Sequence, residues 1–345
     1  MNRYLWRILK QGCMLLVIIW LVFSVLKHFA YVEEYGGSKS QHEEGSVNGF
    51  KKGNRDEQHT GSSNAIPFMG PSNKTKQEHV KMKKDKKKQI EERMERLKRI
   101  CKEFKDSYEY KHPAVTTKSI QLMQVSLDKH TLLWCSVLKA GFSNFRDTFN
   151  KLKAKRTILK IDMKLSHKKI TNYTIRLLNV RNPWERLLSS YWDRIMTNHK
   201  PPTNTRNKWG RTMMAKYHNL NPKKIKYDDI NVTFTEFLQY IVENPKHNRG
   251  HLEPHWMQYF ESCKPCDVPY NFIVKTESLT EDAGFFFKQL GFNKNPFGDT
   301  ERKNRAERLE KSYKDVPSWI MKRLITIYYW DFRLFGYDIE PPHVV

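Results

Sequence analysis

The chain has 345 residues, of which 62 are lysine or arginine and 37 are aspartate or glutamate, so its formal net charge is +25. Hydrophobic residues make up 39% of the chain, which is enough for a core and excludes a protein that is disordered throughout. The excess of positive charge indicates an anionic partner, and composition alone leaves nucleic acid, an anionic membrane surface and an acidic polymer as candidates.

The first predicted element is a membrane anchor over residues 11–31. Its centre is the uncharged run CMLLVIIWLVFSVL (13–26), which follows the short basic tail MNRYLWRILK (1–10). Three basic residues precede the run and one lysine follows it closely, so the positive-inside rule predicts a cytoplasmic N-terminus. A cleaved signal peptide is the alternative, but no small-residue cleavage site follows the run. We therefore expect a single-pass type II membrane protein whose later residues are lumenal.

Two segments separate this anchor from a predicted main domain at 112–345. Residues 32–80 are rich in Gly, Ser, Asn, Gln, Lys and Glu, a composition typical of a flexible stem. A basic helical neck follows at 81–111, with apolar residues at spacings of three and four: Ile90, Met94, Leu97, Cys101 and Phe104. This stripe predicts a helix that docks on the main domain, because it is too short for a stable coiled coil. The sequence leaves a homodimer open.

The cysteines agree with a lumenal location. Four of them lie beyond the anchor: Cys101, Cys135, Cys263 and Cys266. They suit two disulfides, with three possible pairings, whereas half of a zinc site in CKPC lacks a second C-x-x-C or a matched histidine pair. Sequons for N-glycosylation accompany them at Asn73, Asn172 and Asn231. The acidic polymers of that compartment are glycans, so we expect an acidic glycan partner and no nucleic acid.

Strand-like and helical segments alternate from about residue 112. Three apolar runs predict strands: HTLLWCSVL (130–138), TIRLLNVR (174–181) and YNFIVKTE (270–277). Helices are predicted from near Asn144, from Glu185 to Met196, over 279–291 with Gly291 as its C-cap, and over 315–337. This order predicts an α/β fold with a parallel sheet flanked by helices. Ligands of such sheets bind beyond the carboxyl ends of the strands.

The first strand-to-helix junction, LKAGFSNFRD (138–147), has the features of an anion site. Lys139 follows the strand directly, Gly141 permits close backbone approach, and Ser143 and Asn144 can cap the helix. A surface lysine before an ordinary capped helix explains the same residues equally well. The junction lacks the G-x-x-x-x-G-K-[ST] motif, which counts against an NTP-dependent kinase.

The second junction, RNPWERLLSSY (181–191), adds a clamp for another anionic group. Arg181 ends the strand, and Arg186 and Ser189 are three residues apart on one helix face. Arginine forks suit tetrahedral oxyanions, so the two junctions together predict a ligand with two separated phosphate-type groups. For Arg186, an internal ion pair or a snorkelling surface position is an equally good interpretation.

Both motifs resemble the nucleotide signatures of Golgi carbohydrate sulfotransferases, in particular the chondroitin and dermatan 4-O-sulfotransferases. The resemblance extends to HLEPHWMQYFESCKPCDVPYNFIVKTESLTEDAGF (251–285) and to YYWDFRLFGY (328–337). The chain departs from the family pattern at Leu138, Phe142 and Asp147, where proline, cysteine and a basic residue are usual. These departures motivate a second hypothesis, a membrane-anchored glycan-binding protein on an impaired sulfotransferase scaffold.

The resemblance implies a P-loop-like sulfotransferase domain at 112–345 in the Golgi membrane, with its catalytic side lumenal. It further implies sulfuryl transfer from 3′-phosphoadenosine 5′-phosphosulfate (PAPS), without a metal, to a glycosaminoglycan or related glycan, the 4-O position of an N-acetylhexosamine being favoured. Lys139 would stabilise the charge on the sulfate and on the leaving phosphate, and Arg181 and Ser189 would hold the 3′-phosphate. The residues implied to bind the donor are Lys139, Ala140, Gly141, Phe142, Ser143, Asn144, Arg181, Arg186 and Ser189.

The acceptor hydroxyl needs a base near its operating pH, and histidine has the suitable pKa. His255 is the first candidate, His251 the second, and Glu253 a third. The alternative for His255 is a structural role beside Trp256.

Overall fold

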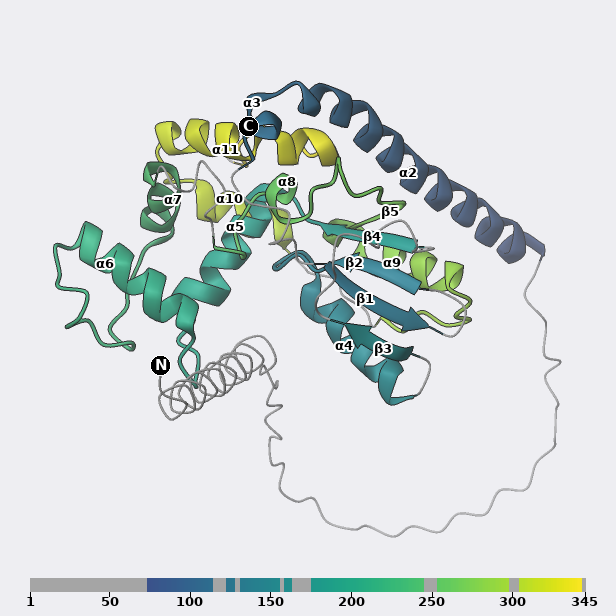
Figure 1. Ribbon diagram of the computed structural model, residues 1–345, viewed down its shortest axis with the longest axis horizontal. Coiled ribbons are helices and arrows are strands. Elements are labelled where there is room, and N and C mark those ends of the chain that lie inside the picture. Colours follow the sequence, from purple (N-terminus) through teal and green to yellow (C-terminus); the bar gives the residue numbers. More distant parts are fainter. Residues whose placement is uncertain are drawn as a thin grey trace, which may run out of the picture. The chain divides into compact units, whose positions relative to one another are not determined.

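The computed structural model describes residues 73–113, 122–127, 131–155, 158–162, 175–244, 253–297 and 304–342 (Figure 1). The predicted tail, the anchor and the stem up to residue 72 lie outside the described residues, as do Asn172 and His251. Within the described ranges, no helix is both long and apolar enough to cross a membrane.

A five-stranded sheet in the order β3-β1-β2-β4-β5 forms the centre of the domain. Its strands are β1 (Leu122–Leu127), β2 (Thr131–Cys135), β3 (Ile158–Asp162), β4 (Ile175–Val180) and β5 (Phe272–Lys275). The three predicted strands are confirmed as β2, β4 and β5, and they are parallel neighbours. Their nearly continuous apolar sequences follow from burial on both faces of the sheet.

The prediction of a sheet made of parallel strands alone is wrong, because β1 runs antiparallel to both β2 and β3. Residues 128–130 are the whole connection between β1 and β2. A parallel pair needs a crossover of about a dozen residues or more, so this short connection forces a hairpin. The sheet is therefore mixed at one edge and parallel where β2, β4 and β5 meet.

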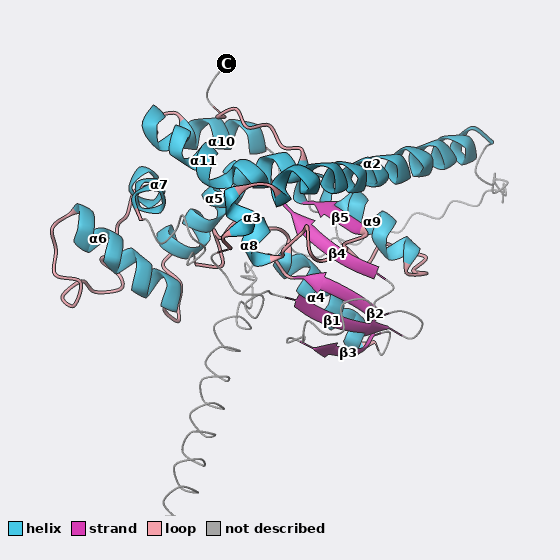
Figure 2. Cartoon of the chain, turned by 45° about the horizontal axis from the view of Figure 1, so that its top comes forward, coloured by secondary structure: helices cyan, strands magenta, loops and turns pink. Residues whose placement is uncertain are grey.

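Helices cover both faces of the sheet (Figure 2). One face packs against α2 (Asn73–Lys105), α8 (Tyr259–Ser262) and α11 (Ser318–Phe335), and the other against α4 (Phe142–Ala154) and α9 (Leu279–Gln289). Alternate residues of β2 serve the two cores, with Leu133 and Cys135 in the first and Leu132 and Trp134 in the second. The predicted docking of the neck helix is confirmed, since Leu97 and Phe104 of α2 are buried in the first core.

A third cluster joins helices that lie beyond the sheet. Its members include Trp184, Phe237, Trp256, Tyr313 and Ile320, all of them buried. The helices around it include α5 (Pro183–Tyr191), α6 (Arg211–Tyr217), α7 (Phe234–Glu243) and α10 (Arg305–Tyr313). A π-helix, Trp192–Met196, continues α5, so the predicted helix from Glu185 to Met196 changes its geometry after Tyr191. The remaining short helices are α3 (Tyr108–Lys111), the π-helix Arg206–Gly210 and the 3-10 helix Thr276–Ser278.

Two disulfides resolve the three pairings that the sequence leaves open. Cys101 of α2 bonds to Cys266, and Cys135 at the end of β2 bonds to Cys263. The two cysteines of CKPC therefore have different partners, and neither thiolate is available to zinc. The bonds fix the neck helix and the central strand to the same turn.

Candidate active site at the carboxyl edge of the sheet

The loop between β2 and α4 has two residues in the left-handed backbone region, Lys139 with φ 65° and Gly141 with φ 85°. Helix α4 begins at Phe142, and Gly141 is its N-cap without a side-chain hydrogen bond. The predicted capping by Ser143 or Asn144 is therefore wrong, because the helix starts early enough to include both. Its first N–H groups have no capping side chain, which leaves them free for an anion.

Arg181, directly after β4, joins the two junctions. Its Nη1 donates to the carbonyl of Lys139 at 3.3 Å, while Nε and Nη2 both donate to Glu185 Oε2 at 3.2 Å. The Arg181 side chain is buried, as is the Glu185 side chain. Two motifs that are more than forty residues apart thus meet at one edge of the sheet, as the sequence predicts.

Arg186 is 2% exposed and braces the loops around this edge. Each of its three guanidinium nitrogens donates to a backbone carbonyl, at 3.1 Å to Leu138, 2.5 Å to Met257 and 3.2 Å to Pro254. This internal role differs from both alternatives considered for the sequence, an ion pair and a surface position. The half-buried Ser189 is different, because its hydroxyl has no hydrogen-bond partner among the residues that the structure describes.

The Lys139 amine donates to Asp193 Oδ2 at 2.6 Å. Burial lowers the pKa of Lys139, and the carboxylate of Asp193 restores it only in part. Burial alone would raise the pKa of Asp193, but the charges of Lys139 and Arg194 outweigh it and hold that pKa below its usual value. Asp193 stands four residues after Ser189, and that helical spacing is the one signal that could have indicated it.

His255 is 1% exposed and forms a dyad with Glu253. The Nδ1 atom of His255 lies 2.5 Å from Glu253 Oε1, and its backbone N–H donates to Glu253 Oε2 at 3.0 Å. Because a carboxylate can only accept, Nδ1 carries the proton and Nε2 keeps a lone pair. Nε2 is buried without a partner among the described residues. This tautomer is the one that a general base at Nε2 requires.

The pKa of His255 reflects the same surroundings. Burial lowers it below the usual value, Glu253 acts in the opposite direction, and the positive charges of Arg194 and Lys139 lower it further. The imidazole is therefore neutral at neutral pH. The charges of Lys139 and Arg194 are close enough to influence its pKa. Ser190, the neighbour of Ser189, holds the His255 carbonyl through its hydroxyl at 2.7 Å.

Three more polar atoms lack hydrogen-bond partners among the described residues, and they belong to two residues that pack against Gly141, in the loop between β2 and α4. They are Oδ1 and Nδ2 of Asn179 and Oγ1 of Thr276, all buried and unpaired within the described part of the chain. A Cβ added to Gly141 would lie 3.5 Å from Thr276 Cγ2 and 3.6 Å from Asn179 Nδ2. Unpaired buried atoms are uncommon and call for a ligand group or a water molecule. The loop thus fits a molecule that both donates and accepts hydrogen bonds, as a nucleotide does.

The three departures from the family pattern have local explanations. The carbonyl of Leu138 accepts the bond from Arg186, and the ring of Phe142 stacks on Trp134 at 5.7 Å. Asp147 is exposed and bonds to its neighbour Arg146 at 3.0 Å. None of the three interrupts the contacts described above.

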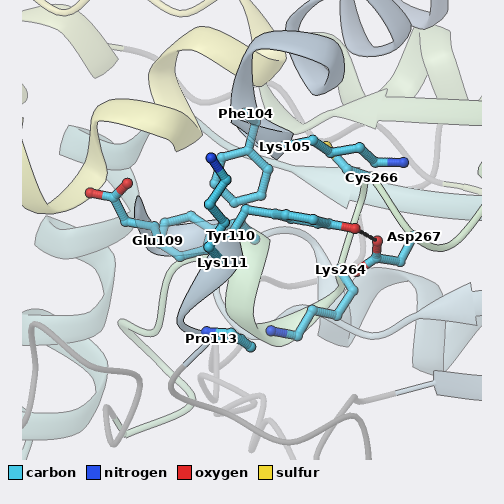
Figure 3. A pocket seen from close by; sticks show the side chains of 10 residues that line it. Phe104, Lys105, Glu109, Tyr110, Lys111, Pro113, Lys264, Cys266 and Asp267 are labelled. Atoms are coloured by element: carbon cyan, nitrogen blue, oxygen red, sulfur yellow. Dashed lines mark hydrogen bonds between the residues drawn. The ribbon is translucent and has the colours of Figure 1, made fainter. Parts of the chain in front are cut away.

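A cavity of about 450 Å³ lies elsewhere, beside the Cys101–Cys266 disulfide (Figure 3). Its lining includes Phe104, Tyr110 and Lys264, and the Tyr110 hydroxyl donates to Asp267 at 2.8 Å. No residue implied to bind the donor lines it. Separately, no cluster of three or more His, Cys, Asp or Glu side chains in the described ranges is placed to hold a metal ion.

Asp331 of α11 is linked to Arg181 through Tyr259. Both of its carboxylate oxygens accept the backbone N–H of Tyr259 at 2.9 Å, and the Tyr259 hydroxyl accepts the backbone N–H of Arg181 at 2.8 Å. Burial raises the pKa of Asp331 to about 7, although these N–H bonds and Arg186 oppose the shift. The carboxyl therefore titrates near neutrality in the folded protein.

We predict that Asp331 makes stability depend on pH. Because its folded pKa lies above its unfolded value, its contribution is fully present below pH about 4 and is lost as the pH rises through about 7. Asp331→Asn keeps an acceptor for Tyr259 and removes this loss, which corresponds to about 4 kcal/mol at pH 8. Urea unfolding of both proteins at pH 4 and pH 8 measures the difference. Equal pH slopes for the two proteins would contradict the assignment.

Comparison with known proteins places the chain in a family. The model of the Sulfotransferase family matches residues 125–338. Human carbohydrate sulfotransferase 9 is 26% identical over 77% of this chain and 64% of its own length. Carbohydrate sulfotransferase 14 of Danio rerio is 28% identical over 61% of both chains, and carbohydrate sulfotransferase 10 of Danio rerio is 26% identical over 72% and 74%.

The chain spans less than two thirds of the length of the first two of these curated relatives. No solved structure gives a significant match. The family model alone covers well over half of the chain, including both junctions, the His255 dyad and the closing helix. The protein is therefore a member of the Sulfotransferase family, homologous to the carbohydrate sulfotransferases.

Proposed function

We propose that the protein transfers a sulfuryl group from PAPS to a hydroxyl of a glycosaminoglycan or related glycan, with the 4-O position of an N-acetylhexosamine favoured. The observation that carries the proposal is the 3.3 Å hydrogen bond from Arg181 to the Lys139 carbonyl, because it joins two anion-binding junctions in one site. A donor with a sulfated 5′-phosphate and a separate 3′-phosphate needs two such positions. Membership of the Sulfotransferase family supports the same donor.

In this proposal different residues bind different groups of the donor. Lys139, the loop residues Ala140 and Gly141 and the first N–H groups of α4, at residues 142–144, hold the sulfated 5′-phosphate. Arg181 and the hydroxyl of Ser189, which has no partner among the described residues, hold the 3′-phosphate. Arg186 acts as a brace, because its nitrogens donate to three carbonyls around the site. The proposal needs no metal, since the phosphate leaving group is good and side-chain cations offset its charge.

His255 Nε2 accepts the proton of the acceptor hydroxyl as the hydroxyl oxygen bonds to sulfur. The bond between sulfur and the 5′-phosphate oxygen breaks, and adenosine 3′,5′-bisphosphate leaves with that pair of electrons. Glu253 stabilises the imidazolium that forms, through the contact at Nδ1. Lys139 offsets the charge that develops on the sulfate and the leaving oxygen.

We also propose the Golgi membrane as the location, with the single-pass anchor at 11–31 and the domain in the lumen. Two disulfides support an oxidising compartment. The net charge of +25 supports an acidic glycan as acceptor, which predicts weaker activity at high ionic strength.

The direct test is transfer of ³⁵S from labelled PAPS to desulfated chondroitin, dermatan and heparan, followed by disaccharide analysis of the product. The proposal expects label on at least one acceptor and a thermal shift with adenosine 3′,5′-bisphosphate but none with ATP. Binding of glycans without transfer to any of them would favour the glycan-binding alternative, and a shift with ATP alone would favour a kinase.

Two variants distinguish the proposed role of Arg181 in donor binding from the role of Arg186 in holding the surrounding loops in place. We expect Arg181→Ala to weaken the affinity for adenosine 3′,5′-bisphosphate by about 10- to 100-fold, because a charge-assisted bond to phosphate is lost. Arg186→Ala instead lowers the free energy of unfolding by about 3 kcal/mol, because buried carbonyls lose their donor. Calorimetric titration and urea unfolding measure the two effects. Unchanged nucleotide affinity in Arg181→Ala would remove Arg181 from the donor site.

A further inference from the structure

An exposed apolar ridge borders the candidate active site. It consists of Trp192, which is 47% exposed, and Met196, which is 43% exposed, on the π-helix that continues α5. Three other tryptophans of the domain, Trp134, Trp184 and Trp256, are fully buried, whereas Trp319 is exposed as Trp192 is. Exposing an indole forfeits a large favourable burial free energy, so such a side chain is a candidate contact for a ligand.

The position of Trp192 in the chain places it beside Asp193, the partner of the Lys139 amine. It stands three residues after Ser189, so the two share one side of the helix, while the next residue, Asp193, bonds to the Lys139 amine at 2.6 Å. Tyr191 precedes Asp193 by two residues, about 200° around the helix, so its ring, which is buried in the third cluster, marks the side away from the Lys139 amine. Trp192 therefore stands between Tyr191, which is in the core, and Asp193, which bonds to the amine that we assign to the sulfate.

The ring of Trp192 has an aromatic neighbour, and its backbone carbonyl is fixed by two hydrogen bonds. The Tyr191 ring meets the indole edge-on, with centroids 5.7 Å apart and an interplanar angle of 66°. The backbone N–H of Thr197 donates to the Trp192 carbonyl at 3.0 Å, and the Thr197 hydroxyl does so at 2.5 Å. The contact with Tyr191 restrains the indole, and a restrained aromatic ring loses less conformational entropy on binding than a mobile one.

We propose that Trp192, extended by Met196, is the platform on which a pyranose ring of the acceptor glycan lies during transfer. This inference rests on the proposed function. A pyranose ring has an apolar face of C–H groups that matches an indole, and hydroxyls at its rim that can bond to charged neighbours. Arg194 lies two residues further on with a side chain that is 20% exposed; its Nε pairs with Asp193 Oδ2 at 3.0 Å, and its positive charge suits an acidic sugar. The adenine of the donor is the rival occupant, and separate measurements on donor and acceptor distinguish the two.

The test compares Trp192→Ala with Trp192→Phe and with Trp319→Ala, since Trp319 on α11 is 46% exposed and forms no part of the site. The acceptor is whichever of desulfated chondroitin, dermatan or heparan the wild-type protein labels fastest. We expect Trp192→Ala to raise the KM for this acceptor about tenfold or more and to leave the Kd for adenosine 3′,5′-bisphosphate within about twofold. Trp192→Phe should recover most of the loss, and Trp319→Ala should match the wild type.

An unchanged acceptor KM in Trp192→Ala overturns the inference, and so does a loss confined to nucleotide affinity, which would assign the indole to adenine. If the wild-type protein transfers sulfate to none of the three chains, the proposed function fails instead. Calorimetric binding of the same chains to the wild type and to Trp192→Ala then still decides whether the platform holds a glycan, because equal affinities would exclude it.

Discussion

Replacing His255 with glutamine is expected to lower turnover by about a hundred- to ten-thousandfold, the usual contribution of a positioned general base. The reason is the buried Nε2 atom, which has a lone pair and no partner among the described residues, while Glu253 fixes the proton on Nδ1. Glutamine keeps a polar side chain but cannot accept a proton at neutral pH. Labelled-sulfate transfer at saturating donor and acceptor measures the effect.

The affinity for adenosine 3′,5′-bisphosphate serves as the control, because His255 has no role in donor binding. If His255→Gln binds the nucleotide normally and also turns over normally, the base is another group, and His251 becomes the first alternative. A variant that binds no nucleotide would show damage to the fold, and circular dichroism would identify it.

The pH profile gives a second, independent check on the dyad. Because burial lowers the pKa of His255, the neutral base persists below pH 6.5, and activity falls only as the pH drops through the lowered value. Glu253 acts to raise that pKa, so Glu253→Gln should move the acid limb of the profile to still lower pH. Movement of the limb toward higher pH would contradict the orientation of the dyad.

Local sequence predicts the parallel centre of this fold well. Strands β2, β4 and β5 are short apolar runs followed by a turn and an amphipathic segment, and those signals do not depend on distant residues. The edge strands escaped prediction because β1 (LMQVSL) and β3 (ILKID) mix polar and apolar residues. Helices α6 and α7 were also missed, since their burial depends on the third cluster rather than on the sheet.

In the candidate site, too, the sequence predicts only those residues whose location follows from local signals. Lys139 and Arg181 follow directly from strand ends, so topology alone brings them together. The function of Arg186 depends on where backbone carbonyls lie in space, and no spacing in the sequence encodes those positions. For Asp193 the four-residue spacing from Ser189 is a signal, but it does not reveal the bond to the Lys139 amine. The disulfide pairing is similar, because Cys135 and Cys263 are 128 residues apart and meet only after the sheet has formed.

Lys139→Met is expected to lower turnover by about a hundred- to a thousandfold, the effect of removing one electrostatic stabiliser from a transition state. Methionine keeps the length of the side chain and loses the charge that would face the sulfate and the leaving oxygen. The Arg181 contact to the loop uses the backbone carbonyl of Lys139, so it survives the substitution, and the affinity for adenosine 3′,5′-bisphosphate should fall far less than turnover.

Asp193→Asn is the matched variant, because it removes the partner of the lysine and keeps the amine. Without this carboxylate the site loses a negative charge that repels anions, so nucleotide affinity should equal or exceed that of the wild type. The pKa of Lys139 should fall, since Asp193 acts to raise it, and activity should then decline at a lower alkaline pH than in the wild type.

Turnover of Lys139→Met within about threefold of the wild type would mean that the lysine serves the fold rather than the transfer step. Weaker nucleotide binding by Asp193→Asn would show that the ion pair orients the amine toward the donor and does not compete with it.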